Sequence, residues 1–493
     1  RMTECAKFVT NMSQNTEVGY ILSIQDYLVY LDGLPTVKIN DLVENEAGVR
    51  GVIASLFNDK VEAWILDEGT LTPGQLFKKT DANLSINTGE FLLGRAINPI
   101  GVPIDGKGPL SKVRGTTLEL EQSASPMKTR EFINEQFISG ITLIDTLVPI
   151  GKGQRQLLLG DAHSGKTPFI IDLIVNQAKL GTVCIYTAVG KPITQVRTTI
   201  DTLAETGALK NTVVVAATSS ENPPLIFYTP YAAMSIAEYF QKQGKDVLII
   251  FDDLGTHAKV YRELALLGGR SPGRQSYPGD IFYTHAKLLE RAGRFNSLNG
   301  GGSITAIPVI ELDLTEFTTF IPTNLMAMTD GHLLFKADLY GQGFRPAVDI
   351  SVSVSRVGRQ TQNRLQNLLA QAIRQILAEA AQLETVSRFS GELPPETQVI
   401  LSRKEIIEEI NKQEALTFIP IEIQIIMLGL TFTSLFRDKN GFFLRKNKQK
   451  ILKFLNDEPK VKSFGKSLMT LKRLDQLIGK LELLVPRLKQ ICQ

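Results

Sequence analysis

The sequence has few of the residues on which covalently stapled or metal-held folds depend. Its 493 residues include 3 cysteines and 4 histidines. Cys5, Cys184 and Cys492 are too few and too widely spaced for a disulfide framework, and the histidines show no metal-ligand spacing. A disulfide-rich secreted domain and a zinc centre are therefore not expected, and a reducing compartment is the default.

Long hydrophobic runs are also missing. The longest purely apolar stretches, such as residues 247–251, have the length of a strand and fall far short of the ~20 residues that a membrane-spanning helix needs. The first residues also lack the charged-then-apolar pattern of a signal peptide. We therefore expect no transmembrane segment.

The chain as a whole has no large excess of one charge. Its net charge of +3 is too small to indicate a nucleic-acid partner. The charge is unevenly distributed, however, because residues 441–493 carry 13 Lys and Arg against 4 Asp and Glu. This basic tail is interpreted either as a surface that meets acidic partners or as a solvated helix face.

The hydrophobic pattern changes twice along the chain, whose length predicts about three domains at roughly 150 residues each. Residues 17–95 contain short β-rich runs separated by turn signals, which is typical of a small antiparallel barrel. Helix-length segments then alternate with strands that are apolar at every position, as in a parallel sheet covered on both faces. These strands are predicted at residues 156–160, 182–186, 212–216, 247–251 and 304–310.

Beyond about residue 358 the apolar residues recur at helical spacing. A further helix is predicted over residues 468–481, with Pro486 closing it. The predicted fold class is therefore α/β, with a β-barrel, a central parallel-sheet domain and a C-terminal helical bundle. The expected limits are an N-terminal arm at 1–16, the barrel at 17–95, the central domain at 96–358 and the helical domain at 359–493.

One segment of the central domain fits the phosphate-binding pattern G-x-x-x-x-G-K-[ST]. It follows a predicted strand and precedes a predicted helix, so its backbone N–H groups and the helix N-terminus would cradle phosphates. Lys166 would reach the outer phosphates, and Thr167 would ligate magnesium. The segment consists of Gly160, Asp161, Ala162, His163, Ser164, Gly165, Lys166 and Thr167.

A P-loop site also needs an acid for the magnesium water shell and, for hydrolysis, a group that activates water. Asp252 ends an apolar strand and is predicted to be the acid that holds magnesium through water. The group that activates water is expected within residues 186–192, where no carboxylate or amide occurs and Lys191 stands instead. Lysine is cationic at neutral pH, so the sequence predicts a P-loop (RecA-like) domain that binds nucleotide but cleaves it poorly.

Several longer motifs resemble the α subunits of F-type ATP synthases. They are the P-loop and the blocks at residues 139–155, 252–254, 272–291, 320–331 and 343–358. The resemblance implies a ring of alternating α and β subunits, in which α holds uncleaved ATP or ADP with Mg²⁺ while β performs the chemistry. The implied partners are β subunits, a central stalk subunit and a peripheral stalk subunit, with no direct nucleic-acid contact.

The resemblance also implies roles for single residues and a location. Arg356 would act in trans as an arginine finger in the neighbouring β site, a task suited to its permanent charge and bidentate fork. Arg345 would face the chain's own nucleotide. The alternatives are that Arg356 caps a strand or pairs with a carboxylate, and that Arg345 forms a structural salt bridge. The complex would be peripheral on an energy-transducing membrane: mitochondrial inner (matrix side), thylakoid, or bacterial (cytoplasmic face).

The chain departs from the family pattern at its P-loop. Ala162 and His163 stand where Arg and Gln are usual, Pro168 follows Thr167 directly, and Lys191 replaces a Gln. Lys191 would either add positive charge beside the phosphates or point into solvent.

Two other functions stay open. The chain could be an α-like structural subunit of a specialised bacterial rotary ATPase, since the arm before the barrel is also short. A Rho- or RecA-like nucleic-acid translocase is disfavoured, because residues 17–95 carry many acids and the single Trp64.

Overall fold

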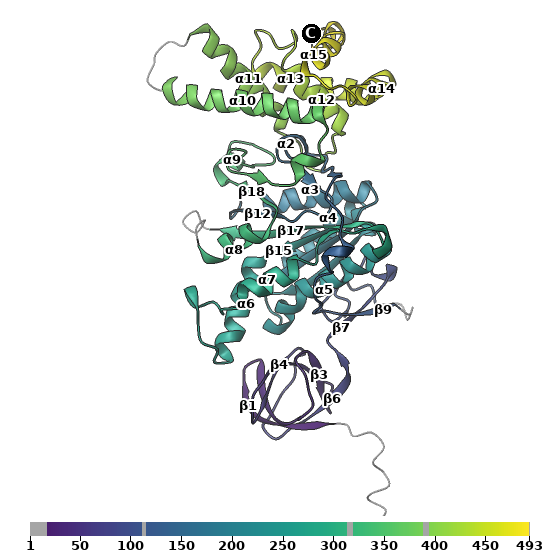
Figure 1. Cartoon of the computed structure of the whole chain (residues 1–493), viewed down its shortest axis with the longest axis vertical. Helices are drawn as coiled ribbons and strands as arrows, with labels where there is room; N and C mark the ends of the chain where they lie inside the picture. The colour runs from purple at the N-terminus through teal and green to yellow at the C-terminus, as the bar shows by residue number, and fades with distance from the viewer. Residues whose placement is uncertain (1–16, 111–114, 313–318, 388–393, 493) are drawn as a thin grey trace, which may run out of the picture.

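The protein consists of three parts stacked along its longest axis (Figure 1). In this computed structural model the residues described are 17–110, 115–312, 319–387 and 394–492. A β-barrel lies at one end, a parallel sheet covered by helices forms the middle, and a helical domain lies at the other end. The predicted fold class is confirmed; the predicted arm, residues 1–16, lies outside the described residues, and the exact domain limits stay predictions.

The barrel closes through six strands in the order β1-β2-β5-β4-β3-β6, all antiparallel. Side chains alternate between its interior and the solvent, as in β3, so that Leu31, Val43, Ile53 and Phe77 fill its core. The strands are β1 (Val18–Gln25), β2 (Leu28–Gly33), β3 (Asp41–Asn45), β4 (Arg50–Leu56), β5 (Val61–Ile65) and β6 (Leu76–Asn83).

The middle part is built on a nine-stranded sheet within the described residues, in the order β19-β18-β12-β17-β15-β13-β14-β8, with β16 beside β17. The predicted parallel strands are confirmed as β12, β13, β14, β15 and β17. The strands of this sheet are β8 (Ala96–Ile97), β12 (Gln156–Asp161), β13 (Val183–Lys191), β14 (Thr212–Thr218), β15 (Asp246–Asp252), β16 (Gly293–Arg294), β17 (Ser303–Leu312), β18 (Gly331–Phe335) and β19 (Val354–Ser355).

Helices cover both faces of this sheet, which explains why its strands are apolar throughout. On one face α3 and α4 pack into one buried apolar cluster. On the other face α5, α6 and α7 pack into a second one. The helices are α2 (Thr142–Leu147), α3 (Lys166–Lys179), α4 (Ile193–Glu205), α5 (Pro223–Lys242), α6 (Leu254–Leu267), α7 (Ile281–Leu289), α8 (Phe320–Met328) and α9 (Ala337–Gly341).

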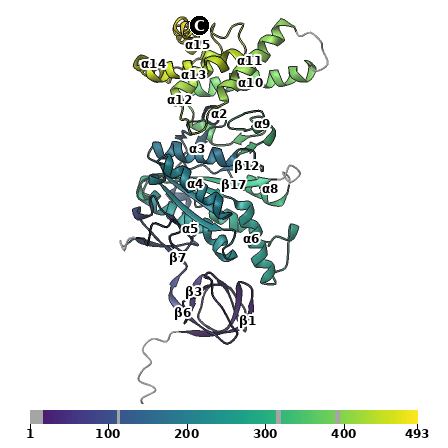
Figure 2. The same ribbon diagram turned by 180° about the vertical axis from the view of Figure 1, so that it is seen from behind.

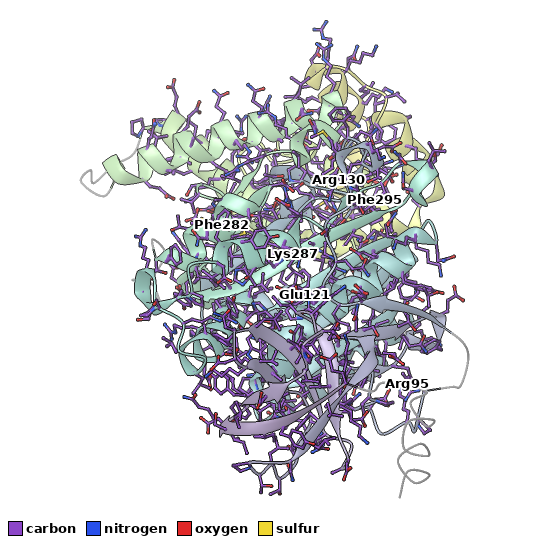
Figure 3. The ribbon with its side chains drawn as sticks, turned by 60° about the horizontal axis from the view of Figure 1, so that its bottom comes forward. Arg95, Glu121, Arg130, Phe282, Lys287 and Phe295 are labelled. Atoms are coloured by element: carbon purple, nitrogen blue, oxygen red, sulfur yellow. The ribbon has the colours of Figure 1, made fainter. Side chains whose placement is uncertain are left out.

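A connecting segment between the barrel and the P-loop strand wraps the outside of the middle part. Glu121 lies 2.8 Å from Lys287 on α7, and Arg130 donates to the Ala292 carbonyl and lies over the Phe295 ring (Figure 3). These contacts hold an otherwise extended stretch against the helices. Its strands are β7 (Ser85–Thr88), β9 (Thr116–Glu119), β10 (Gln136–Phe137) and β11 (Ile150–Gly151).

The C-terminal part is helical, as predicted, and seven helices are described within it (Figure 2). The helix predicted over residues 468–481 is in fact divided, because α14 ends at Leu468 and α15 begins at Leu474. Pro486 lies in the first turn of α16, where its missing N–H costs little, so the prediction that it closes a helix was wrong. The helices are α10 (Arg364–Ser387), α11 (Pro395–Asn411), α12 (Ile421–Leu430), α13 (Gly441–Asp457), α14 (Pro459–Leu468), α15 (Leu474–Glu482) and α16 (Val485–Ile491).

No helix among the described residues is both long and apolar enough to span a membrane.

Candidate nucleotide-binding site

The P-loop lies between the end of β12 and the start of α3, as the sequence predicted. Gly165 adopts a left-handed conformation with φ of +89°, and a Cβ there would come within 2.5 Å of the Tyr340 ring. His163 also has a positive φ, of +57°, which is uncommon for a residue with a side chain. Ala162, His163 and Thr167 are exposed around the loop, so its outer surface is open to a ligand.

Lys166 turns inward onto its own loop. Its Nζ donates to the carbonyl of Gly160 at 2.8 Å and to the carbonyl of Asp161, and it lies 3.4 Å from the Ser164 hydroxyl. Burial lowers the pKa of Lys166, and the Lys191 ammonium lowers it further. The amine that would reach the outer phosphates is thus held among carbonyl oxygens, which a phosphate oxygen would replace.

Lys191 forms a charge cluster with two carboxylates at this end of the sheet. Its Nζ lies 2.8 Å from Asp252 Oδ1 and 3.3 Å from Asp253 Oδ2. The other oxygen of Asp252 accepts a bond from the Tyr186 hydroxyl at 2.9 Å, and Asp253 Oδ1 accepts from the Thr256 N–H at 2.6 Å. All four carboxylate oxygens therefore already have a partner within the protein.

The charges of this cluster support one another. Burial alone would lower the pKa of Lys191, but the charges of Asp252 and Asp253 outweigh it and raise the pKa above its usual value. Burial likewise raises the pKa of Asp252, against the attraction of Lys191. Lys191 is therefore a permanent cation and cannot act as a general base for water attack.

The sheet order explains why these groups meet. The strands β12, β17, β15 and β13 are consecutive neighbours and run parallel, so their carboxyl ends lie at one edge. That edge carries the P-loop, Glu311, Asp252 and Lys191 in turn. A cavity of about 640 Å³ opens there, lined among others by Lys191, Asp253, Lys259 and Glu311.

Glu311 was missed by the sequence reasoning. Its strand partner is Gly160, the first residue of the P-loop, and its side chain is exposed with no ion pair among the described residues. Its charge favours the protonated form of Lys166. The rule that found Asp252, a carboxylate at the end of an apolar strand, could have found Glu311 too.

A second cavity, of about 250 Å³, adjoins the loop itself and is lined by Gly165, Pro168, Tyr340, Arg345 and Gln413, among others. The Arg345 guanidinium stacks 3.4 Å from the centre of the Tyr340 ring and donates to the carbonyls of residues 340 and 344. Arg345 is thus brought to the P-loop, with no ion pair among the described residues. Tyr340 and Gln413 are far from the loop in sequence, and no local signal indicated them.

Arg356 lies away from this site. It follows β19, whose Ser355 pairs with Gly331 at the start of β18, and Gly331 in turn pairs with Gln156 at the start of β12. The P-loop begins at Gly160 near the other end of β12, four residues on, which corresponds to roughly 13 Å of strand. The Arg356 side chain is exposed and makes no ion pair within the described part of the chain. Of the two alternatives, pairing with a carboxylate is not seen among the described residues, whereas Arg356 does lie directly after the end of β19, where the strand-capping alternative would place it.

The predicted magnesium ligands are not gathered into a metal site. Thr167 is exposed at the start of α3, whereas both oxygens of Asp252 are bonded to Lys191 and Tyr186. No group of three or more His, Cys, Asp or Glu side chains suited to a metal occurs across the described residues. The structure therefore leaves the magnesium site a prediction.

Comparison with known proteins agrees with this architecture. Residues 140–355 match the family described as "ATP synthase alpha/beta family, nucleotide-binding domain". The chain is 38% identical over 451 residues to the ATP synthase subunit alpha of Caldanaerobacter subterraneus subsp. tengcongensis, which covers 91% of this chain and 89% of that protein. It is 41% identical over 414 residues to the ATP synthase subunit alpha of Staphylococcus aureus strain JH9, a match that covers 84% of this chain and 82% of that protein. The chain therefore belongs to the ATP synthase alpha/beta family, with the alpha subunits as its relatives.

Proposed function

We propose that this chain is the non-catalytic, ATP-binding α subunit of an F-type ATP synthase ring. It would alternate with β subunits, contact central and peripheral stalk subunits, and serve proton-gradient-driven ATP synthesis and the reverse hydrolysis on the surface of an energy-transducing membrane. The alpha-subunit relatives and the P-loop support nucleotide binding. The relatives, together with the position of Arg356, support a role in a ring.

The observation that carries the non-catalytic assignment is Lys191. A hydrolytic site needs a group that orients or deprotonates water at the end of the strand after the P-loop helix. Here that position holds a cation bound to Asp252 and Asp253. The P-loop, with Arg345 beside it, would hold ATP or ADP without consuming it.

Arg356 would complete the catalytic site of the neighbouring β subunit. An exposed arginine with no ion pair among the described residues, at the edge of the sheet and far from the chain's own phosphates, is suited to reach a partner's nucleotide. Arginine fingers of this kind increase the rate of turnover by about 10³- to 10⁵-fold. Lysine keeps the charge but lacks the bidentate fork.

The test is Arg356→Lys in the assembled ring. We expect turnover to fall by at least about 10²-fold while the nucleotide content of this subunit is unchanged, because the finger acts in the partner's site. Arg359→Lys is the matched control, an exposed arginine three residues on whose Nε donates to Asn367, and it should keep near-normal turnover. Normal turnover in Arg356→Lys would refute the finger assignment.

The isolated chain tests the non-catalytic assignment separately. It should bind adenine nucleotide and hydrolyse it negligibly, and Glu311→Gln should change neither property. Brisk hydrolysis by the isolated chain that Glu311→Gln abolishes would identify Glu311 as a base and overturn the proposal. Absence of any bound nucleotide would favour the purely structural subunit instead.

The predicted Mg²⁺ fits the donor set poorly. The ion would be bound by the Thr167 hydroxyl and, through water, by Asp252, and it would shield the phosphate charge. Both Asp252 oxygens, however, are engaged by protein groups.

A further inference from the structure

The cluster around Lys191 has the charge arrangement of a metal site with an ammonium at its centre. Lys191 Nζ touches one oxygen of each of two adjacent carboxylates, at 2.8 and 3.3 Å. The remaining two oxygens accept from Tyr186 and from the Thr256 backbone. Magnesium in nucleotide sites relies on such carboxylates for its water shell, and here none of their oxygens is free.

Displacing the lysine would be costly. The Asp252 and Asp253 side chains are only 6% and 9% exposed, and that of Lys191 is 18% exposed. Separating a largely buried ion pair leaves charges without partners, which is strongly destabilising. An incoming cation would therefore compete with an ammonium that is attached to the chain and always present.

The position of the ammonium in the sheet also bears on nucleotide binding. It is placed at the same sheet edge as the P-loop by the consecutive strands β12, β17, β15 and β13, and it lines the cavity that opens there. Together with Lys166 it supplies two fixed positive charges to that edge. Two of the three N–H donors of Lys191 are directed at Asp252 and Asp253, and the third would meet a phosphate oxygen in place of an ion from solution.

We propose that the Lys191 ammonium stands in place of the divalent cation, so that this site takes its nucleotide as the metal-free polyphosphate. The inference rests on the proposed function, since it assumes that the P-loop binds a nucleotide. It reverses the usual preference of P-loop sites, in which magnesium bridges the outer phosphates.

The experiment measures ATP binding to the full-length isolated chain by calorimetry, once with excess EDTA and once with excess Mg²⁺. We expect ATP to bind about tenfold or more tightly in EDTA than in Mg²⁺, because excess Mg²⁺ holds ATP as its metal complex and leaves little metal-free polyphosphate for the site. Lys191→Gln should bind ATP about tenfold or more weakly in EDTA and regain affinity with Mg²⁺. Lys191→Arg retains a cation and should keep the preference for EDTA.

Lys259→Gln is the matched control. Lys259 is exposed and lines the same cavity, and no ion pair joins it to Asp252 or Asp253. Its replacement should leave the preference for EDTA unchanged. A second readout uses Mn²⁺ with ATP as a paramagnetic probe: Lys191→Gln should give a protein-bound Mn²⁺ signal that the unaltered chain lacks.

The outcomes separate the two proposals. If the unaltered chain binds ATP only with Mg²⁺ and gives a bound Mn²⁺ signal, the inference is overturned and the proposed nucleotide site stays intact. Glu311 would then be the first candidate metal ligand to replace. If neither the unaltered chain nor folded Lys191→Gln binds ATP in either buffer, nucleotide binding itself is overturned, and the inference with it. Circular dichroism establishes that each variant is folded.

Discussion

Lys448 on α13 caps the end of another helix. Its Nζ donates to the carbonyls of Glu409 and Ile410, in the last turn of α11, and to that of Lys412, which follows the helix. Burial lowers the pKa of this lysine to about 8. The last carbonyls of a helix have no partner within it, so one ammonium satisfies three acceptors that would otherwise be orphaned.

Replacing Lys448 with Met should therefore destabilise the C-terminal domain. We expect a loss of about 2 to 3 kcal/mol in the free energy of unfolding, because buried carbonyls lose their donor while the apolar stem is kept. Chemical denaturation followed by circular dichroism measures it. Lys446→Met, an exposed change on the same helix, should stay within about 0.5 kcal/mol, and an equal effect of both variants would contradict the capping role.

A buried histidine pair in the middle domain makes stability depend on pH. His257 Nδ1 and His285 Nε2 lie 3.1 Å apart, and His257 stacks on the Phe227 ring. Burial lowers the pKa of His257 to about 4 and that of His285 well below its usual value. Both rings are therefore neutral in the folded protein, while the unfolded chain binds protons near pH 6.5.

The sign of the dependence follows from proton counts. Between about pH 6.5 and 4 the unfolded state binds more protons at His257, so this contribution to stability is lost as the pH falls through that window. The difference is on the order of 3 kcal/mol for His257. His257→Phe should flatten the acid side of a plot of unfolding midpoint against pH. His163→Gln, at an exposed histidine, should leave that plot unchanged; a similar flattening there would contradict the assignment.

At the scale of elements, Asp145 joins the P-loop domain to the helical domain. This fully buried carboxylate, on α2, accepts from the Ser139 N–H and hydroxyl at 2.7 Å, the Gly140 N–H at 2.9 Å and Gln424 Nε2 at 2.8 Å. Gln424 belongs to α12, so one side chain fixes a loop and a helix that are distant in sequence. Burial nevertheless raises the pKa of Asp145 to about 6.

We expect Asp145→Asn to weaken this junction by about 2 to 4 kcal/mol, because an amide N–H₂ would face groups that are themselves donors. Since the folded pKa lies above the unfolded value of about 3.8, the carboxylate's contribution to stability falls as the pH rises from about 4 to 6. Asp145→Asn should remove this slope, which opposes that of His257. Unfolding midpoints at pH 4.5 and 7 measure both effects, with Asp475→Asn at an exposed ion pair as the control; loss of the slope in Asp475→Asn would contradict this account.

At the scale of the whole molecule, the barrel is coupled to the middle domain by aromatic packing. Trp64, the one tryptophan of the chain, is 3% exposed and meets Phe227 of α5 edge-on at 5.4 Å. The helical domain is coupled differently, since its core is continuous with that on the α3 face of the sheet. Both contacts are largely apolar, so the three parts should unfold together.

Tryptophan fluorescence reports this coupling directly. In the unaltered chain we expect the fluorescence transition to coincide with that of circular dichroism. Phe227→Ala should cost about 3 to 5 kcal/mol and shift both transitions, because it leaves a cavity between barrel and sheet. Phe57→Ala, at an exposed residue after β4, should shift neither by much. An early fluorescence transition that Phe227→Ala does not move would show that the barrel unfolds alone.

The sequence by itself determined the local features. Alternating and continuous apolar patterns predicted a barrel and a parallel sheet, because side-chain periodicity depends on backbone geometry alone. The P-loop was equally local, since its glycines, lysine and flanking elements are contiguous. The sequence did not predict where the last helices begin and end, because a proline is compatible with the first turn of a helix as well as with the residues after its end.

Only the tertiary structure decided which distant side chains meet. Lys191 joins Asp252 and Asp253 because β13 lies beside β15 in register, a pairing that neither strand specifies alone. Tyr340 packs on Gly165 for the same kind of reason, and Arg356 is carried to the opposite end of the sheet by its antiparallel edge strand. Strand order and register arise from the burial of the whole core, so the charge balance of the nucleotide site depends on the completed fold.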